Sequence, residues 1–530
     1  MTEKRQFRAI KGTRDILPPD SSLWNWFEQA AREVFETYGF REIRIPIFEP
    51  TELFARAVGF ETDIVGKEMF ILEQAYENKT SSDLDHLRET IKFMAISSAG
   101  EESFDSFKKA LDRFSAEYKT ALDQGLVYQY EHAHVGVGYL DDGISLLADL
   151  LNGPREAGWQ GVFRAVAAQT IDYLHHILLE ATSALRPEAT ASVVRAYIEH
   201  GMHTLPGNVK LYYIGPMFRR ERPQKGRYRQ FYQVGAEVLG QSDAPAIDAE
   251  VIEMLLTLFK RVGLANTALS VNSIGCKECR PKYVEVLREE LRKVKDSLGP
   301  DSQRRIETNP LRVLDSKLPE EQPIIERLPR ISDHLCAACR QHFSELQDEL
   351  SLRGIIYEEN WRLVRGLDYY TRTTFEVTAA GLGSQNAVCG GGRYDGLVEL
   401  LGGLPTKGIG FAIGTDRAIL SLQEGLNPPK VANLAVFVAW MGAKSYPTAV
   451  KIARKLRECG LAVELPPEEM KFKKSLGLAD KLGARYALIV GEDEVASGTY
   501  TLKRLADAEQ QKLNENDLLE YLESERRGSG

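Results

Sequence analysis

The sequence predicts an α+β protein with a separate α/β unit at its C-terminal end. Residues typical of strands predominate in 185–240 and again in 361–420, whereas 250–360 are mostly amphipathic helix. Runs of strands followed by runs of helices are typical of α+β folds. After Pro428-Pro429-Lys430, which is typical of a linker, strand and helix patterns alternate to about residue 490, as in a parallel α/β unit.

Length and composition exclude several classes of protein. The chain has 530 residues, 43% hydrophobic and 27% charged, which suits about three globular domains rather than a disordered chain or a fibre. It has no apolar run long enough to span a membrane and no secretion signal at its N-terminus. Six cysteines are too few for a disulfide scaffold. A cytoplasmic protein is therefore expected, and the net charge of −9 argues against indiscriminate binding of nucleic acid.

The first segment predicts a helix and then a strand. The turn at 18–21 supplies cap residues, and apolar side chains follow at helical spacing from Trp24 to Phe35. Gly39 ends this helix. Polar and apolar residues then alternate over Arg41–Ile47, which predicts a half-buried strand that bends or lies at an edge because of Pro46.

The residue pattern of 75–183 differs from that of the flanking segments and predicts a small helical domain. Helical runs at 104–122, 144–151 and 162–179 are separated by Gly and Asp breaks. The segment also holds five of the nine histidines, including His132, His134, His175 and His176. These side chains could bind a metal, but ordinary solvated or packed histidines are the favoured interpretation.

The segment Met217 to Glu237 carries the clearest chemical signal. Between Arg219 and Arg229 six basic residues stand against one acid, in a chain that is acidic overall. Pro223 and Gly226 prevent a continuous helix, so two strands joined by a cationic loop are expected. Guanidinium groups bind phosphate oxygens as a fork, which makes the loop a candidate phosphate site, although a solvated charged hairpin has the same composition.

Two further segments are candidates for ligand binding. In Trp361–Val377 an arginine, an aspartate and two tyrosines lie close together, which suits either a polar small molecule or a capped turn. Three successive glycines at 390–392 allow close approach of a ligand to the backbone. Neither a Walker loop nor a convincing dinucleotide fingerprint is present, so any nucleotide is bound on another scaffold.

Together these motifs resemble the histidyl-tRNA synthetase family of class II aminoacyl-tRNA synthetases. Lys11-Gly-Thr-Arg-Asp15 and Gly39-Phe-Arg-Glu-Ile-Arg-Ile-Pro46 resemble its N-terminal signature and its dimer-forming motif 1. Met217–Glu237 and Gly408–Arg417 resemble motifs 2 and 3. Class II motifs are degenerate, whereas Leu363-Val-Arg-Gly-Leu-Asp-Tyr-Tyr370 resembles a signature specific to the histidine enzyme.

The resemblance implies a class II antiparallel-sheet core with helical insertions and an anticodon-binding domain. The core is expected at 1–74, 184–275 and 361–425, and a helical insertion at 276–360. The anticodon-binding domain is expected at 431–522, with Lys471-Phe-Lys-Lys474 and Lys503-Arg504 on phosphates. Residues 75–183 are an unrecognised insert that replaces a short turn of the family. It leads directly to Glu188, so it is a candidate to modulate histidine binding, to contact the tRNA or to bind a ligand or partner of its own.

The resemblance also implies an activity and its residues. Histidine would react with ATP to give histidyl-adenylate, and the histidyl group would pass to the 3′ end of tRNA(His). Arg219 and Arg365 are the implied catalytic residues, and Arg219, Glu221 and Arg417 the implied ATP site, with Mg²⁺ as cofactor. The implied histidine site comprises Glu188, Thr190, Gln233, Glu237, Arg365, Tyr369, Tyr370 and Tyr394. Ala189 stands where the family often has glycine, a change expected to be tolerated.

Two Cys-x-x-Cys pairs suggest a metal. Cys276 and Cys279, with Cys336 and Cys339, have the spacing of a four-thiolate zinc knuckle. Their separation is longer than in a compact zinc ribbon, which favours two pairs of ordinary thiols slightly over zinc.

The expected protein is a homodimeric histidine–tRNA ligase. One alternative is a catalytically inactive, histidine-binding paralogue of the kind that regulates ATP phosphoribosyltransferase, although the retained arginines and the C-terminal unit argue against it. The other is a sensor in which the insert gates a core that no longer turns over.

Overall fold

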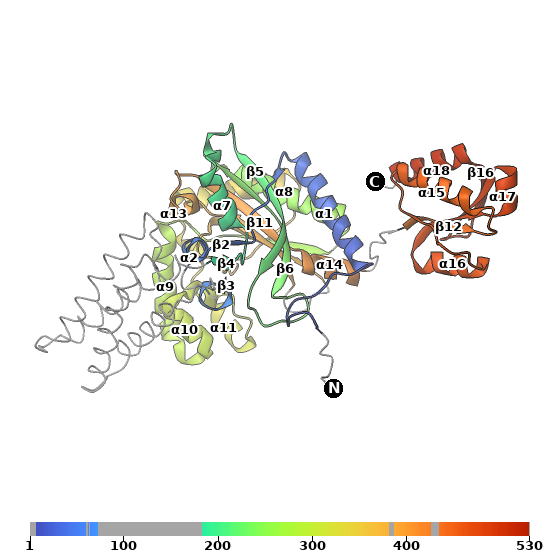
Figure 1. The fold of residues 1–530 in the computed structure, drawn as a ribbon. Coiled ribbons are helices and arrows are strands. Elements are labelled where there is room, and N and C mark those ends of the chain that lie inside the picture. Colours follow the sequence, from blue (N-terminus) through green and yellow to red (C-terminus); the bar gives the residue numbers. More distant parts are fainter. Residues whose placement is uncertain are drawn as a thin grey trace, which may run out of the picture. The chain divides into compact units, whose positions relative to one another are not determined.

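The computed structural model describes residues 7–59, 62, 64–72, 183–264, 266–380, 386–425 and 434–528. The chain forms two units, one made mainly of residues 30–425 and the other mainly of residues 426–530 (Figure 1). The helical runs and the four histidines singled out between 75 and 183 lie outside the described residues.

An eight-stranded sheet forms the centre of the first unit. Its inner strands are antiparallel, and only the short edge strands β1 and β8 pair in parallel with their neighbours. In spatial order the strands are β1 (Arg41–Glu42), β5 (Val209–Phe218), β6 (Gln230–Gly240), β11 (Lys407–Gly414), β10 (Ala387–Arg393), β9 (Thr371–Ala379), β7 (Thr267–Ser273) and β8 (Glu358–Glu359). The predicted α+β fold with an antiparallel core sheet is confirmed.

Helices of this unit surround the sheet, and α9, α10 and α11 gather at one end of the unit in Figure 1. The helices within the described residues are α1 (Asp20–Thr37), α2 (Thr51–Val58), α7 (Thr190–Glu199), α8 (Pro245–Arg261), α9 (Cys279–Lys293), α10 (Pro300–Thr308), α11 (Gln322–Ile325), α12 (Ala337–Leu352), α13 (Leu397–Leu400) and α14 (Thr415–Glu424). Short π and 3₁₀ turns lie at η1 (Ile64–Glu68), η2 (Met202–Thr204), η3 (Lys295–Ser297), η4 (Pro310–Val313), η5 (Pro319–Glu321) and η6 (Ile331–His334).

The two faces of the sheet are covered differently. Phe35 of α1 packs edge-on against Tyr212 of β5 and Phe411 of β11, which lie on one face. The neighbouring Tyr213 points to the opposite face, because side chains alternate along a strand. There it joins a core with residues of α2 and α7. This second face carries the candidate site.

A small three-stranded sheet lies beside the core, in the order β2 (Phe48–Pro50), β4 (Ser183–Leu185) and β3 (Phe70–Leu72). Strands β3 and β4 are antiparallel, and Leu72 is the register partner of Ser183. The two chain ends that border residues 73–182 therefore lie side by side. Arg186 follows β4 directly and donates hydrogen bonds to the carbonyl oxygens of Ile45 and Pro216.

The second unit has a five-stranded mixed sheet in the order β13-β12-β14-β15-β16. Its elements are β12 (Leu434–Trp440), α15 (Tyr446–Glu458), β13 (Val463–Glu464), α16 (Phe472–Lys481), β14 (Ala484–Val490), α17 (Glu492–Ser497), β15 (Thr499–Arg504), β16 (Gln510–Asn514) and α18 (Glu515–Gly528). The three predicted strands are parallel, as expected. Strands β15 and β16, which extend the sheet in antiparallel fashion, were not predicted.

The strand predicted over Arg41–Ile47 is wrong in extent. Only Arg41–Glu42 pair with the sheet, and the chain forms a second strand at Phe48–Pro50 in the small sheet. Pro46 lacks the N–H that a continuing ladder would need, and the carbonyl groups of Ile45 and Pro46 instead accept hydrogen bonds from Arg186. Among the described residues no helix is long and apolar enough to cross a membrane.

Candidate active site

A cavity of about 300 Å³ opens on the second face of the sheet, between the β5–β6 loop and strands β10 and β11. Four arginines line it: Arg219 and Arg227 from the loop, Arg365 from the segment before β9, and Arg417 from α14. Glu221, Gln233 and Glu376 also line it. Several guanidinium groups around one small cavity suit a ligand that carries several phosphate oxygens.

Small residues in register lie on this face of the sheet, and two of them, Gly390 and Ala412, line the cavity. Ala412 of β11 lies between Gly235 of β6 and Gly390 of β10, so the three residues share one face. A Cβ on Gly390 would overlap the guanidinium group of Arg365, and a Cβ on Gly235 would overlap the ring of Tyr213. The glycine at 390, from the triple-glycine run, therefore makes room for Arg365.

Backbone carbonyl groups and a carboxylate hold the arginines in place. The Nε of Arg219 donates to Pro187 O at 2.9 Å, and its guanidinium lies 5.2 Å from the ring centre of Phe231. The Nη1 of Arg417 donates to Ala387 O at 2.8 Å. The Nη1 of Arg365 lies 3.0 Å from Oε2 of Glu376. Each contact uses one nitrogen of a guanidinium group and thereby fixes the orientation of its remaining N–H donors.

Beside the cavity lies a buried cluster of two carboxylates and several hydroxyl groups. Both oxygens of Glu188 accept backbone N–H bonds at the start of α7, from Thr190 at 2.8 Å and from Ala191 at 2.9 Å. Thr190 Oγ1 donates to Oε1 of Glu237 at 2.7 Å. The hydroxyl of Tyr394 donates to Oε2 of the same glutamate at 2.7 Å. One network thus joins α7, β6 and the end of β10.

Both carboxylates hold a proton more tightly than an ordinary glutamate does. Burial raises the pKa of Glu237 to about 8; the Glu188 carboxylate adds to the rise, and the hydrogen bonds from Tyr394 and Thr190 oppose it. Burial also raises the pKa of Glu188, against the two backbone hydrogen bonds. Glu237 therefore keeps its proton to a higher pH than an ordinary glutamate.

Tyr369, Tyr370 and Gln233 connect the cluster to the cavity. The ring centres of Tyr369 and Tyr370 are 4.7 Å apart, and Arg365 lies 5.9 Å from the Tyr370 ring. Gln233 lines the cavity, and its side chain lies on the same face of β6 as that of Glu237. Among the described residues, Gln233 Oε1, Arg365 Nε and the Tyr213 hydroxyl are buried without a hydrogen-bond partner. Buried polar atoms of this kind point to a polar ligand.

The structure thus brings together every side chain that was predicted from the sequence to bind histidine or ATP. Arg219, Glu221, Gln233, Arg365 and Arg417 line one cavity, and the remaining ones form the adjoining cluster. Tyr213, Phe231 and Glu376 were not predicted as site residues, whereas Arg227 belongs to the predicted cationic loop. The alternation of β6 places Phe231 on the face of Gln233, so periodicity was an available signal for it; Glu376 is brought to Arg365 only by the fold.

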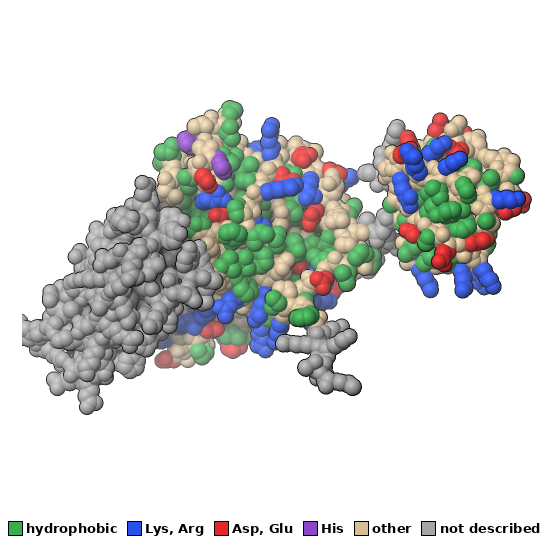
Figure 2. All heavy atoms as spheres, in the orientation of Figure 1, with side chains coloured by type: hydrophobic (Ala, Val, Ile, Leu, Met, Phe, Trp, Pro, Cys, Tyr) green, Lys and Arg blue, Asp and Glu red, His purple; other side chains and the backbone are tan. Residues whose placement is uncertain are grey.

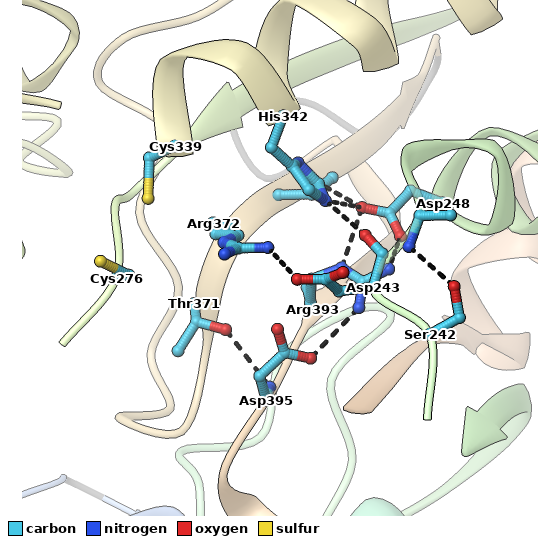
Figure 3. Close-up of polar contacts among 12 residues, drawn as sticks. Ser242, Asp243, Asp248, Cys276, Cys339, His342, Thr371, Arg372, Arg393 and Asp395 are labelled. Atoms are coloured by element: carbon cyan, nitrogen blue, oxygen red, sulfur yellow. Dashed lines mark hydrogen bonds and ion pairs between the residues drawn. The ribbon is translucent and has the colours of Figure 1, made fainter. Parts of the chain in front are cut away.

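A buried ionic network that was not predicted from the sequence lies close to the site (Figure 3). Asp248 of α8 and Arg393 of β10 are almost fully buried and form an ion pair. Thr373 donates to Asp248 at 2.6 Å, and Arg393 also contacts Asp395 at 3.1 Å. His342 of α12 lies 3.8 Å from Asp248. Arg393 directly precedes Tyr394, so the network fixes the end of β10 that presents this tyrosine to Glu237.

Comparison with known proteins agrees with this architecture. The family described as histidyl-tRNA synthetase matches residues 180–418, and the anticodon binding domain family matches residues 435–525. The antiparallel sheet with its arginine-lined cavity is thus the catalytic core of an aminoacyl-tRNA synthetase, followed by an anticodon-binding domain.

Comparison with individual relatives shows which family of synthetases the chain belongs to. The chain is 44% identical to a histidine–tRNA ligase of Koribacter versatilis, over 97% of this chain and 96% of that one. It is 43% identical to the enzyme of Solibacter usitatus, over 98% and 99%. The crystal structure of apo histidyl-tRNA synthetase from S. aureus, 29% identical, matches with a TM-score of 0.62 over 98% of this chain and 100% of that chain. The chain belongs to the histidyl-tRNA synthetase family.

Proposed function

We propose that this chain is a histidine–tRNA ligase, which activates histidine with ATP and transfers the histidyl group to the 3′ end of tRNA(His). The observation that carries the proposal is the continuity of two sites. A cavity lined by four arginines adjoins a buried cluster of carboxylates and hydroxyls, and Arg365 and Gln233 lie where the two meet.

The cavity suits ATP. Arg219, steadied by Pro187 and Phe231, would contact the α-phosphate, and Arg417 the γ-phosphate end. Arg365 would stabilise the charge that develops on the α-phosphate during transfer. Phe231 and Tyr228 on the cavity wall offer aromatic faces for the base. In this arrangement catalysis consists mainly of positioning and charge neutralisation.

The cluster suits histidine. Glu188 and Thr190 would receive the substrate ammonium group, which favours an anionic Glu188. Gln233, Glu237, Tyr369, Tyr370 and Tyr394 would surround the imidazole, whose two nitrogens require one donor and one acceptor when neutral. A buried polar pocket of this kind rejects substrates that leave its groups unpaired.

The reaction follows from these placements. A carboxylate oxygen of histidine attacks the α-phosphorus, the bond from this phosphorus to the bridging oxygen breaks, and pyrophosphate leaves. The terminal ribose hydroxyl of tRNA then attacks the carbonyl carbon of the adenylate, and AMP leaves.

Magnesium fits the cavity by its donor set. Glu221 and Glu376 present carboxylates on its wall, where they form ion pairs with Arg227 at 3.3 Å and with Arg365 at 3.0 Å. Carboxylate oxygens together with phosphate oxygens are the ligands that Mg²⁺ prefers. Bound there, the ion would neutralise phosphate charge.

The C-terminal unit is proposed to bind tRNA. In Figure 2 Lys and Arg side chains gather at the edge of this unit where α16 lies in Figure 1. Lys471, Lys473 and Lys474 are exposed at the start of α16. Such contacts bind phosphates and are sensitive to salt. A cytoplasmic homodimer is proposed as well, on the resemblance of residues 39–46 to the dimer-forming motif.

The test is histidine-dependent exchange of pyrophosphate into ATP. The wild-type chain should exchange, Arg365→Ala should lose activity by at least ~10²-fold, and Arg304→Ala, an exposed arginine of α10, should match wild type. A folded wild-type chain that binds histidine without exchange would support the regulatory paralogue instead. Exchange that appears only after residues 73–182 are removed would support the gated sensor.

A further inference from the structure

Four cysteine side chains from two distant segments meet at one point of the first unit. Cys276 and Cys279 lie between β7 and the first turn of α9, and Cys336 and Cys339 lie at the start of α12. Their sulfur atoms all lie within 4.8 Å of one another. Individual separations are 3.7 Å for Cys276–Cys279, 3.9 Å for Cys276–Cys336 and 3.8 Å for Cys279–Cys339.

These separations suit a tetrahedral metal. With a zinc–sulfur bond of about 2.3 Å, the edge of a regular tetrahedron of sulfurs is about 3.8 Å. A disulfide requires sulfurs about 2.05 Å apart, and all four residues are free thiols. Four thiolates without a carboxylate or imidazole favour zinc over the harder cations.

The surrounding backbone is arranged around the sulfurs. The N–H of Cys276 donates to Sγ of Cys279 at 3.2 Å, and the N–H of Glu278 donates to Sγ of Cys276 at 3.4 Å. Gly275 has φ +71°, and a Cβ there would crowd the sulfur of Cys279. Amide donors of this kind support metal thiolates. Cys279 and Cys339 are buried, whereas Cys276 and Cys336 are partly exposed and leave a path for an ion.

We propose that Cys276, Cys279, Cys336 and Cys339 bind one structural zinc ion. Four protein ligands close the coordination shell, so the ion has no position for a substrate or a reactive water. Its role is to tie the start of α9 to the start of α12, and thereby to fasten the helical insertion to the core sheet.

The same four-cysteine knuckle braces the start of β9 and the residue before it. Ile274 N donates to Arg372 O, and Arg372 N donates to Gly275 O, both at 2.8 Å. Arg280, one residue after Cys279, donates to the carbonyl oxygen of Tyr370. Figure 3 shows Cys339 on the same helix as His342, with Arg372 nearby. Loss of the metal should therefore loosen the backbone at residues 366–372.

Metal analysis of the full-length chain, purified without a histidine tag or chelator, tests the proposal directly. About one zinc per chain is expected. The Cys276→Ser/Cys336→Ser double variant should lose it, and Cys459→Ser, in the second unit, should retain it. Absence of zinc from the folded wild-type chain overturns the proposal. So does stoichiometric iron, equal zinc in the double variant, or a mass showing two disulfides.

A second measurement does not depend on the variants folding. Cobalt(II) added to wild-type protein stripped of metal should produce the intense visible bands of a tetrahedral thiolate site, and zinc should abolish them. Hydrogen exchange should be faster for the peptide covering residues 366–372 in stripped protein, and zinc should restore it. A colourless cobalt complex, or exchange unaffected by zinc, contradicts the site or its bracing role respectively.

Discussion

Leu72 of β3 and Ser183 of β4 are register partners in an antiparallel pair, although residues 73–182 lie between them in the chain. Any segment that leaves and returns at such a pair can be exchanged for a short turn without stretching the sheet.

A deletion tests whether the inserted segment is needed. Replacing residues 73–182 by Asn-Gly should give a two-residue hairpin loop between Leu72 and Ser183. The variant should fold and keep pyrophosphate exchange within about threefold of wild type, because the ends already meet. A folded deletion variant with much weaker histidine binding would show that the segment shapes the pocket through Glu188.

The close approach of Gly390 and Arg365 gives a second prediction. Gly390→Ala would push the guanidinium aside, since the added methyl overlaps it. A displacement of the guanidinium by about 1 Å should reduce the exchange rate by ~10²-fold. The fold should survive, because only the end of a flexible side chain has to move. Gly477→Ala, at an exposed helical position with open space around it, is the control and should be unaffected.

Removing the Tyr394 hydroxyl should weaken histidine binding selectively. Tyr394→Phe leaves Oε2 of Glu237 buried without its donor, a loss of about 1–3 kcal/mol. The KM for histidine should rise about 10-fold or more, whereas the KM for ATP should stay near wild type. Tyr500→Phe, in the second unit, controls for loss of a buried tyrosine hydroxyl. Equal rises in both KM values would contradict a role confined to the histidine pocket.

The raised pKa of Glu237 predicts that the free energy of unfolding depends on pH. Its pKa is about 8 in the folded protein against an ordinary 4.5, so the folded state holds a proton that the unfolded state releases between these values. Its contribution to the free energy of unfolding is full below about pH 4.5 and lost as pH rises through 8. Relative to Glu237→Gln, the wild-type melting temperature should fall from pH 5 to pH 8.5. Glu320→Gln, at an exposed site, should follow wild type; a constant offset for Glu237→Gln would refute the raised pKa.

The buried Asp248–Arg393 pair should matter more for stability than an exposed pair. Asp248→Asn leaves Arg393 buried with Asp395 as its remaining carboxylate partner, and should cost ~3–5 kcal/mol in the free energy of unfolding. Asp301→Asn, which breaks the exposed pair with Arg304, should have little effect. Thermal melting of both variants makes the comparison. Similar small shifts would mean that the buried network is dispensable.

Local chemistry explains which elements could be predicted. The helix ending before Gly39 and the β5–β6 hairpin with its cationic loop follow from apolar periodicity and from Pro and Gly positions, so the sequence indicates them correctly. The end of the strand after Glu42 depends on Arg186, which lies far away in the chain and takes the carbonyl groups of Ile45 and Pro46. Strands β15 and β16 lie beyond the predicted α/β alternation; β15 joins the sheet by pairing with β14, and β16 by pairing with β15.

The sequence by itself determined the family and the residue types of the site, because motifs record which side chains are present. Only the tertiary structure decided how they act together. Antiparallel register sets Ala412 between Gly235 and Gly390, burial raises the pKa of Glu237, and two helix starts bring four sulfurs within 4.8 Å. Each of these effects depends on distances between residues remote in the chain, which no local pattern specifies.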